Sequence, residues 1–315
     1  MTDNLYPLVT IIGPTGSGKS DLALTLANAY DGEILNCDSL QVFRYFQIGT
    51  AKLPAEAHQG IPHHLIDICN PDALMSAGEY ARLAKESLKG ITHRQKLPIL
   101  CGGTGFYLKA LLEGLSPSPE RNEELRRKLA AREAAATGSL HRILTRLDQE
   151  AAGRIQPQDI NKTMRALEIR ILAGKPGSDF MAGKRQGLEG YRVLKIGLNP
   201  PRPLLHQRLN ERCMRMFEDG LLDEVKSILA RGYSEDAKPF ESIGYKESLA
   251  LLRGQMDFKQ ALELAQIHSR QYAKRQLTWF RRDEAVVWIP EFGNTATAQQ
   301  KATELVKSFL HNETF

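Results

Sequence analysis

The stretch LVTIIGPTGSGKS, residues 8–20, decides the fold class. A short apolar run precedes Gly, four further residues, Gly, Lys and Ser, which is the pattern of a phosphate-binding loop between a strand and a helix. The glycines let the backbone turn so that several N–H groups point inward and form an anion cradle with the start of the next helix. Lys19 adds a positive charge, and Ser20 offers a hydroxyl to Mg²⁺. The pattern predicts a phosphate ligand without identifying what is attached to it.

Strand and helix signals alternate along much of the chain. The apolar spacing at residues 21–30 and 79–92 is typical of amphipathic helices, and helices dominate from residue 203 onward. Besides the strand at residues 8–12, short apolar runs predict strands at residues 33–38, 64–68, 97–103, 191–199 and 284–289. Strands separated by helices predict an α/β fold with a parallel sheet core flanked by helices and joined by right-handed crossovers.

The character of the sequence changes at residues 115–122, LSPSPERN, which read as a linker because they are rich in proline and serine. Residues 123–173 are charged, rich in alanine and helical in pattern. Residues 173–187 contain several glycines and a proline and predict a mobile loop. We therefore expect an α/β core of residues 1–115 and 191–315, with an all-helical insertion domain at residues 116–190.

Composition narrows the class of protein further. The net charge of +5 over 315 residues is a weak indication of an anionic partner. No run of 18 apolar residues occurs, and the first residues lack the pattern of a secretory signal, so we expect no membrane partner and a cytoplasmic protein. The four cysteines are far apart, which favours reduced thiols over a disulfide framework or a zinc site. We expect a monomer.

The phosphate loop alone leaves several functions open. A small-molecule kinase would use the helical insertion as a lid, and a non-catalytic RNA-binding NTPase module is a further alternative. Asp38 follows the second predicted strand, at the sheet edge where ligands bind in such folds, and could be a metal ligand, a general base or the cap of a short helix. The nearby lysine in IGTAK, Lys52, suits an anion-binding loop. His63 and His64 have no third ligand at metal spacing, which predicts structural roles.

Six motifs in a fixed order extend the pattern over about residues 8–288. They are GPTGSGKS, DSLQVFRYFQIGTAK, PHHLID, GGTGFYLKALLEGL, IGYKE and RQYAKRQLTWFRR. Together they resemble the tRNA dimethylallyltransferases, also called tRNA isopentenyltransferases, in their shorter bacterial form. This family moves a dimethylallyl group from its diphosphate to the exocyclic N6 amine of the adenine at position 37 of tRNAs that read codons beginning with U.

The resemblance implies a P-loop NTPase-like core and a role for each catalytic position. Asp38 would accept the proton of the amine, Ser20 would contact the metal ion or the leaving group, and Arg212 would stabilise the leaving diphosphate. By the residues alone, Arg212 could equally belong to a solvated helix face. The cofactor implied is Mg²⁺, with Ser20 as its protein ligand. The diphosphate would be bound by Gly13, Pro14, Thr15, Gly16, Ser17, Gly18, Lys19 and Ser20.

The resemblance also implies contacts with the tRNA anticodon stem-loop, whose adenine must flip out of its stack to reach Asp38. Without it, Thr104 could be a helix N-cap and the basic residues near Trp279 a solvated helix face. The implied tRNA-binding residues are Asp38, Ser39, Leu40, Gln41, Thr104, Arg126, Asn161, Lys162, Thr163, Met164, Arg165, Gly244, Tyr245, Lys246, Arg270, Lys274 and Arg281.

Overall fold

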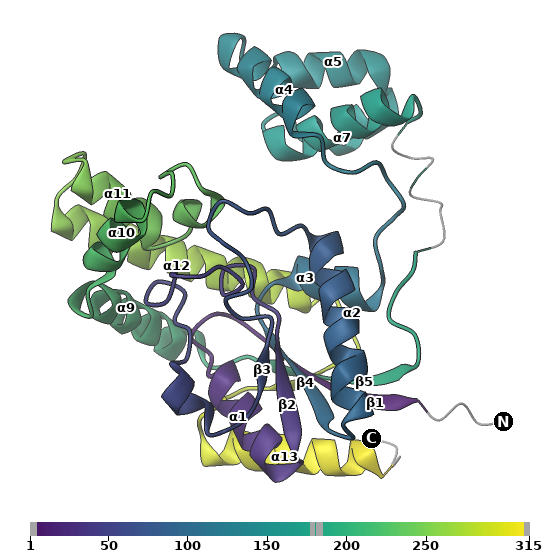
Figure 1. Cartoon of the computed structure of the whole chain (residues 1–315), viewed down its shortest axis with the longest axis vertical. Coiled ribbons are helices and arrows are strands. Elements are labelled where there is room, and N and C mark those ends of the chain that lie inside the picture. The colour runs from purple at the N-terminus through teal and green to yellow at the C-terminus, as the bar shows by residue number, and fades with distance from the viewer. Residues whose placement is uncertain (1–4, 177–179, 181–184, 312–315) are drawn as a thin grey trace. The chain divides into compact units, whose positions relative to one another are not determined.

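The computed structural model describes residues 5–176, 180 and 185–311. The chain divides into two compact units, one formed by Met1–Leu112 and Leu188–Phe315, the other by Glu113–Gly187 (Figure 1). Part of the loop predicted at residues 173–187, namely 177–179 and 181–184, lies outside the described residues.

The larger unit is built on one six-stranded sheet whose order is β3-β2-β4-β1-β5-β6. Every pair of neighbouring strands is parallel, which confirms the predicted α/β class. At the centre, Val9 of β1 is in register with Ile99 of β4 and Leu194 of β5, so the apolar core crosses the middle of the sheet. The strands are β1 (Tyr6–Ile12), β2 (Gly32–Asn36), β3 (His63–His64), β4 (Leu97–Gly102), β5 (Tyr191–Leu198) and β6 (Val286–Ile289).

The third strand is shorter and earlier than the sequence predicts. β3 covers only His63–His64, whereas the apolar run HLIDI predicts a strand at residues 64–68. Leu65 and Asp67 adopt left-handed backbone conformations, with φ of 61° and 54°. Such values are incompatible with a strand, so the chain leaves the sheet directly after His64.

Helices cover both faces of the sheet (Figure 1). On one face, α1 (Lys19–Ala29) and α13 (Ala296–Leu310) pack together over an apolar cluster that includes Val9, Ile11 and Ile196. On the other face, α2 (Ala77–His93) and α3 (Gly105–Leu112) pack over a cluster that includes Leu8 and Leu100. Neighbouring residues of β1 thus point into opposite layers, as the alternation of side chains along a strand requires.

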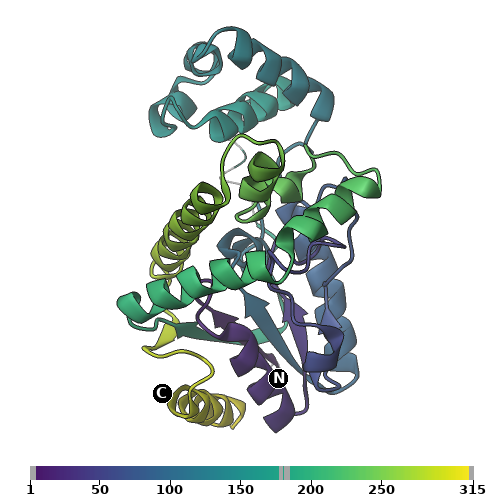
Figure 2. The ribbon, with the colours of Figure 1, turned by 90° about the vertical axis from the view of Figure 1, so that its left-hand side faces the viewer.

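A further group of helices lies beyond the ends of the strands (Figure 2). It consists of α9 (Arg202–Glu218), α10 (Leu221–Ala230), α11 (Tyr245–Leu252) and α12 (Phe258–Phe280). Their apolar sides share one cluster with the loop after β2, through Val42 and Phe46. Two short 3₁₀ turns, Ala55–His58 and Lys238–Glu241, complete this unit. The helical group therefore positions the loop that begins at Asp38.

The smaller unit is all-helical in its described part, as predicted for the insertion. Leu129, Leu140, Leu144 and Leu167 form its apolar core. Its helices are α4 (Glu123–Ala135), α5 (Ser139–Leu147), α6 (Gln149–Arg154) and α7 (Ile160–Ala173). No helix in the described part of the chain is long and apolar enough to cross a membrane.

Candidate active site

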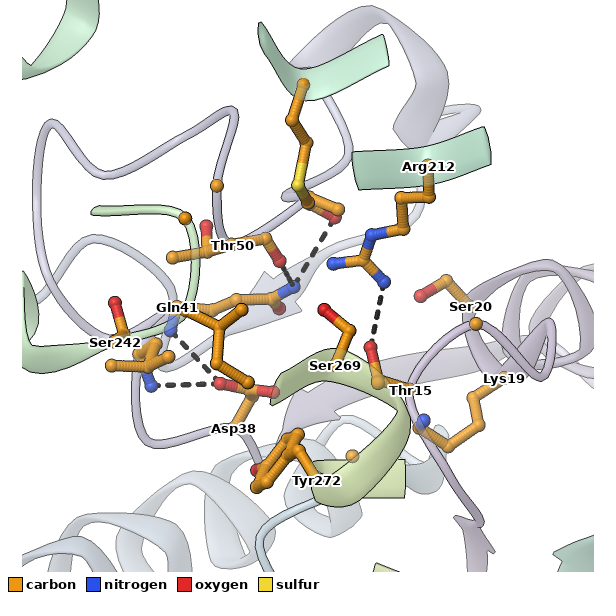
Figure 3. A pocket seen from close by; sticks show the side chains of 18 of the residues that line it. Thr15, Lys19, Ser20, Asp38, Gln41, Thr50, Arg212, Ser242, Ser269 and Tyr272 are labelled. Carbon is orange, nitrogen blue, oxygen red and sulfur yellow. Dashed lines mark hydrogen bonds between the residues drawn. The ribbon is translucent and has the colours of Figure 1, made fainter. Parts of the chain in front are cut away.

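The main cavity of the larger unit has a volume of about 540 Å³. It is lined by the loop after β1, the loop after β2, the end of β4, and helices α9 and α12. In Figure 3, Thr15, Lys19, Ser20 and Arg212 lie toward one side, and Asp38, Gln41 and Tyr272 lie toward the other. We call these the phosphate side and the acceptor side.

The phosphate side begins with a glycine loop whose backbone only glycine can adopt without strain. Gly16 and Gly18 have φ values of 77° and 85°. A Cβ on Gly16 would lie 2.9 Å from Leu209 of α9, and one on Gly18 would lie 2.9 Å from the backbone nitrogen of Gly293. The loop is therefore held in a turned conformation by a helix and a loop that are remote in sequence.

Lys19 and Ser20 open helix α1 and both line the cavity. The Nζ of Lys19 donates to the carbonyl oxygen of Pro14 at 2.8 Å, which folds the side chain back over its own loop. Burial lowers the pKa of Lys19 from 10.5 to about 8, while the nearby Asp38 carboxylate partly opposes this shift. A buried ammonium without a close anion is costly, so this arrangement favours the binding of a phosphate group.

Helix α9 adds a stripe of arginines to this charge. Arg208, Arg212 and Arg215 all line the cavity, and Arg212 Nη1 donates to Thr15 Oγ1 at 2.8 Å. The side chain of Arg212 is thereby directed at the phosphate loop. Arg208 and Arg215 were not among the predicted residues. Their spacing of four and three residues from Arg212 places all three on one helix face, and that spacing is visible in the sequence.

The acceptor side is organised around Asp38, whose carboxylate has a local structural role. Its Oδ1 accepts the backbone N–H of Leu40 at 2.9 Å and of Gln41 at 3.4 Å (Figure 3). Among the described residues, no hydrogen-bond donor reaches Oδ2. Asp38 therefore caps a turn with one oxygen, although no helix follows it as the capping alternative would require, and leaves the second oxygen available at the cavity wall.

Thr104 joins the end of β4 to the loop of Asp38. Its Oγ1 accepts the backbone N–H of Ser39 at 3.0 Å, and its own N–H donates to the carbonyl oxygen of Cys37 at 3.1 Å. Its carbonyl oxygen also accepts the first N–H groups of α3, from Tyr107 and Leu108. Thr104 thus holds the residues on both sides of Asp38 and begins a helix at the same time.

Helix α12 contributes two cavity-side residues that were not predicted. Tyr272 lines the cavity, and burial raises its pKa, with the Asp38 carboxylate adding to the shift. Gln276 is only 5% exposed and bonds to the backbone of both the phosphate loop and the end of β4. A polar residue at the buried position of an amphipathic helix is the sequence signal that could have indicated Gln276.

The far end of the Asp38 loop is clamped by the half-buried Glu224 and the buried Tyr245. Glu224 Oε2 accepts the backbone N–H of Ile48 at 2.9 Å, and Glu224 Oε1 accepts the hydroxyl of Tyr245 at 2.5 Å. The Tyr245 oxygen in turn accepts the N–H of Gly49 at 3.1 Å. The prediction that the Tyr245 side chain contacts tRNA is therefore corrected, because that side chain is fully buried and burial raises its pKa.

The prediction that Lys52 suits an anion-binding loop is also corrected, because this residue has a structural role. Its Nζ donates to Asp67 at 2.6 Å and to the carbonyl oxygen of Phe43, and its side chain is 1% exposed. Of the two neighbours of Tyr245, one is buried like it and the other is exposed. Gly244 is buried, with a φ of 90° that begins α11, while Lys246 is exposed.

The predicted RNA-binding face of α12 is partly exposed. Lys274 and Arg281 lie at the surface, and Arg281 donates to Asn199 at 3.2 Å. Arg270 is half-buried and donates to Asn210 of α9 at 2.5 Å. Trp279 is 40% exposed. Its indole ring lies against Gly105 at the start of α3, so closely that a Cβ at this position would collide with the ring.

In the smaller unit, the predicted residues divide into buried and exposed groups. Arg126 and Arg165 both pair with the buried Glu168, at 3.2 and 2.6 Å. Asn161 and Lys162 are exposed. Thr163 and Met164 are only 1% and 8% exposed, so the prediction that their side chains contact tRNA is corrected: they belong to the core of this unit.

Histidines near the sheet edge have structural partners, in line with the sequence interpretation. His64 Nε2 lies 2.6 Å from Glu33 Oε2, and His63 stacks on His58 with ring centroids 3.8 Å apart. In the part of the chain that the structure describes, no group of three or more His, Cys, Asp or Glu residues could hold a metal ion.

These features are those of a P-loop α/β fold in which a cationic loop and a carboxylate face one cavity. The IPP transferase family model matches residues 41–283. The chain is 54% identical to a tRNA dimethylallyltransferase of Solibacter usitatus over 96% of this chain and 99% of that protein. It is 47% identical to a tRNA dimethylallyltransferase of Koribacter versatilis over 98% of this chain and 100% of that protein. The chain belongs to the IPP transferase family.

Solved structures agree with this assignment. The full-length tRNA isopentenylpyrophosphate transferase of Bacillus halodurans is 36% identical, with a TM-score of 0.72 over 97% of each chain. A eukaryotic dimethylallyltransferase, described as acting on tRNA, is 26% identical, with a TM-score of 0.83 over 98% of this chain and 81% of that one. The resemblance found in the sequence motifs is thereby confirmed.

Proposed function

We propose that this protein transfers a dimethylallyl group from dimethylallyl diphosphate to the N6 amine of the adenine at position 37 of tRNAs that read codons beginning with U. Membership of the IPP transferase family makes it a tRNA-modifying prenyltransferase. The observation that supports this chemistry best is the pairing of a cationic phosphate loop with a free carboxylate oxygen across one cavity. The products are N6-(dimethylallyl)adenosine and diphosphate.

The phosphate side would stabilise the leaving group. As the allylic carbon–oxygen bond breaks, negative charge grows on the diphosphate oxygen, and positive groups already in place lower the barrier. Lys19, Arg212 and the N–H groups of the glycine loop supply that charge and need no large rearrangement, because Arg212 is already bonded to Thr15. No phosphorus atom is attacked in this reaction.

The acceptor side would activate the amine. The exocyclic nitrogen of adenine is a weak nucleophile because its lone pair is delocalised into the ring. Oδ2 of Asp38 can orient the N–H and accept its proton as the new carbon–nitrogen bond forms. Oδ1 meanwhile keeps the carboxylate fixed through the N–H groups of Leu40 and Gln41. The adenine must flip out of the anticodon loop to reach this position.

We also propose Mg²⁺ as the cofactor. Ser20 offers a hydroxyl oxygen at the start of α1, and Mg²⁺ typically combines one or two protein ligands with substrate phosphates and water. The donor set fits a metal held mainly by the diphosphate. When bound, the ion would neutralise charge on the leaving group.

The tRNA anticodon stem-loop is the proposed partner. Exposed cations suited to its phosphates are Lys246, Lys274 and Arg281 in the larger unit and Lys162 in the smaller one. Because tRNA is the substrate, we propose that the protein works in the cytoplasm. We propose that it works as a monomer, since one chain supplies both sides of the cavity.

Labelled substrate gives the decisive test. Purified protein is mixed with Mg²⁺, dimethylallyl diphosphate carrying the label in its prenyl group, and an anticodon stem-loop with adenine at position 37. Label should enter the RNA, and a matched stem-loop with guanine at position 37 should receive none. ATP hydrolysis or phosphorylation of a small molecule without labelled RNA would overturn the proposal in favour of a kinase.

A further inference from the structure

The side chain of Gln276 joins two loops that approach the cavity from different strands. Its Oε1 accepts the backbone N–H of Thr15 in the phosphate loop at 2.8 Å. Its Nε2 donates to the carbonyl oxygen of Gly103, directly after β4, at 2.9 Å. These two partners lie 261 and 173 residues away in the sequence. The contact therefore exists only because α12 lies across the ends of the strands.

The space around this amide admits little variation. A Cβ on Gly103 would lie 2.2 Å from Nε2 of Gln276, so any other residue at 103 would displace the amide. On the opposite side, Thr15 is also held by Arg212 of α9 through its Oγ1. Thr15 is thus fixed through its backbone by α12 and through its side chain by α9.

The hydrogen bond to Gly103 also connects Gln276 to the loop of Asp38, the proposed general base. Thr104 follows Gly103, and it bonds to Ser39 N–H and to the carbonyl oxygen of Cys37, the two residues that flank Asp38. Hydrogen bonds and the chain link between Gly103 and Thr104 therefore connect Thr15, through a single side-chain amide, to the two residues that flank Asp38. The two ends of this connection are the proposed leaving-group site and the proposed base.

We propose that Gln276 is a positioning residue for the transfer reaction, which fixes the separation between the diphosphate loop and the loop of Asp38. The inference rests on the proposed function. The amide accepts from Thr15 and donates to Gly103 at the same time, which neither an apolar side chain nor an ionised carboxylate can do. A displacement of about 1 Å between reacting groups can cost about 100-fold in rate, so this bridge would affect the chemical step more than binding.

The test compares two near-isosteric variants with a matched control. Gln276→Met removes the acceptor and the donor, while Gln276→Glu keeps the acceptor and loses the donor when ionised. Gln300→Met makes the same chemical change on α13, where the side chain is exposed. Single-turnover rates are measured with saturating dimethylallyl diphosphate and adenine-37 stem-loop. Dissociation constants for pyrophosphate and stem-loop, and melting temperatures, are measured in parallel.

We expect Gln276→Met to lower the single-turnover rate by about 100-fold with little change in either dissociation constant, and Gln300→Met to match the wild type. The neutral acid of Gln276→Glu can both donate and accept. The rate of that variant relative to wild type should therefore rise as the pH falls while both dissociation constants stay close to wild type, since a buried charge that only disturbed packing would weaken binding as well. This ratio also tests the proposal if Gln276→Met does not fold.

Three results would overturn the inference. These are a wild-type rate in Gln276→Met, a loss that lies wholly in the dissociation constants, and a Gln276→Glu ratio that does not depend on pH. A wild-type enzyme that gives no prenylated RNA would instead overturn the proposed function.

Discussion

On the phosphate side of the cavity, neighbours in sequence make most of the site, whereas on the acceptor side one carboxylate depends on remote parts of the chain. Lys19 and Ser20 belong to the same short loop and helix start, and Lys19 even bonds to Pro14 of that loop. The Asp38 loop is instead held by Thr104 after β4 and by Glu224 and Tyr245 of the helical group.

This difference indicates which substitutions should impair diphosphate binding and which should impair activation of the amine. An anion site made largely of the backbone N–H groups and charges of one turn should tolerate most distant changes, except those at Arg212 and Gln276, which hold Thr15. A base held by long-range contacts is sensitive to changes far from it. Substitutions on the two sides should therefore separate binding of the diphosphate from activation of the amine.

The largest effect is expected from Asp38→Asn. The amide oxygen can still accept from Leu40 and Gln41 and keep the turn, but the second position no longer accepts a proton. We expect turnover to fall by about 1000-fold while stem-loop binding remains. Single-turnover rates and RNA binding by fluorescence anisotropy measure the two effects.

Asp38→Ala is the matched variant that removes the turn as well. It should lose both turnover and some stability, whereas Asp38→Asn should lose turnover alone. A high rate in Asp38→Asn would show that the carboxylate serves only as a cap.

The second effect is the pH dependence of diphosphate binding. The pKa of Lys19 is lowered to about 8 in the folded protein, so the ammonium loses its proton as the pH rises through 8. Affinity for pyrophosphate should be constant below that pH and fall by about tenfold per pH unit above it. Titration calorimetry between pH 6.5 and 9.5, roughly the range that brackets this pKa, measures the change.

Lys19→Arg is the control, because an arginine keeps its charge over that range and reports only the titration of pyrophosphate itself. The same shift affects stability in the opposite sense. The unfolded chain, with its lysine pKa near 10.5, binds more protons between pH 8 and 10.5, so this group makes the folded state more stable as the pH rises. If Lys19→Arg lost pyrophosphate affinity as steeply as the wild type, the pH dependence could not be assigned to Lys19.

What the sequence could predict also depends on whether the residues of a feature are close together or remote in the sequence. The glycine loop and Asp38 were predictable because a motif of consecutive residues defines each of them. The parallel sheet followed from strand and helix periodicity. Gln276 and the Glu224–Tyr245 clamp were not predicted, because their role depends on which backbone groups the fold brings to them from distant positions. Tyr245, Thr163 and Met164 were placed at an RNA contact by their motif, although tertiary packing buries them.

The third effect concerns RNA binding by α12. Lys274 on α12 and Arg281 at its C-terminal cap are exposed cations, and another face of this helix lines the cavity with Tyr272. The double variant Lys274→Ala with Arg281→Ala should weaken stem-loop binding about tenfold and make its salt dependence less steep by about one to two units. Binding titrations at several salt concentrations provide the slope, and affinity for pyrophosphate should stay unchanged.

Lys301→Ala with Lys307→Ala is a matched control on α13, where both lysines are exposed. An unchanged slope in the α12 variant would show that these two residues do not contact phosphates. The comparison would then place RNA binding elsewhere on the molecule.

The smallest effect should come from the clamp of the Asp38 loop. Tyr245→Phe keeps the buried ring against Phe46, 4.8 Å between centroids, but removes the oxygen that accepts Gly49 N–H and the hydroxyl that donates to Glu224. A buried group left without its partner costs about 1–3 kcal/mol, so the variant should be less stable by about that amount. Because Gly49 and Thr50 line the acceptor side, the KM for stem-loop should rise several-fold while pyrophosphate affinity stays the same.

Tyr6→Phe, at a residue that is 55% exposed, is the control for removal of a hydroxyl. An equal loss of pyrophosphate affinity and stem-loop affinity in Tyr245→Phe would mean that the clamp supports the whole cavity, and that its two sides are not independent.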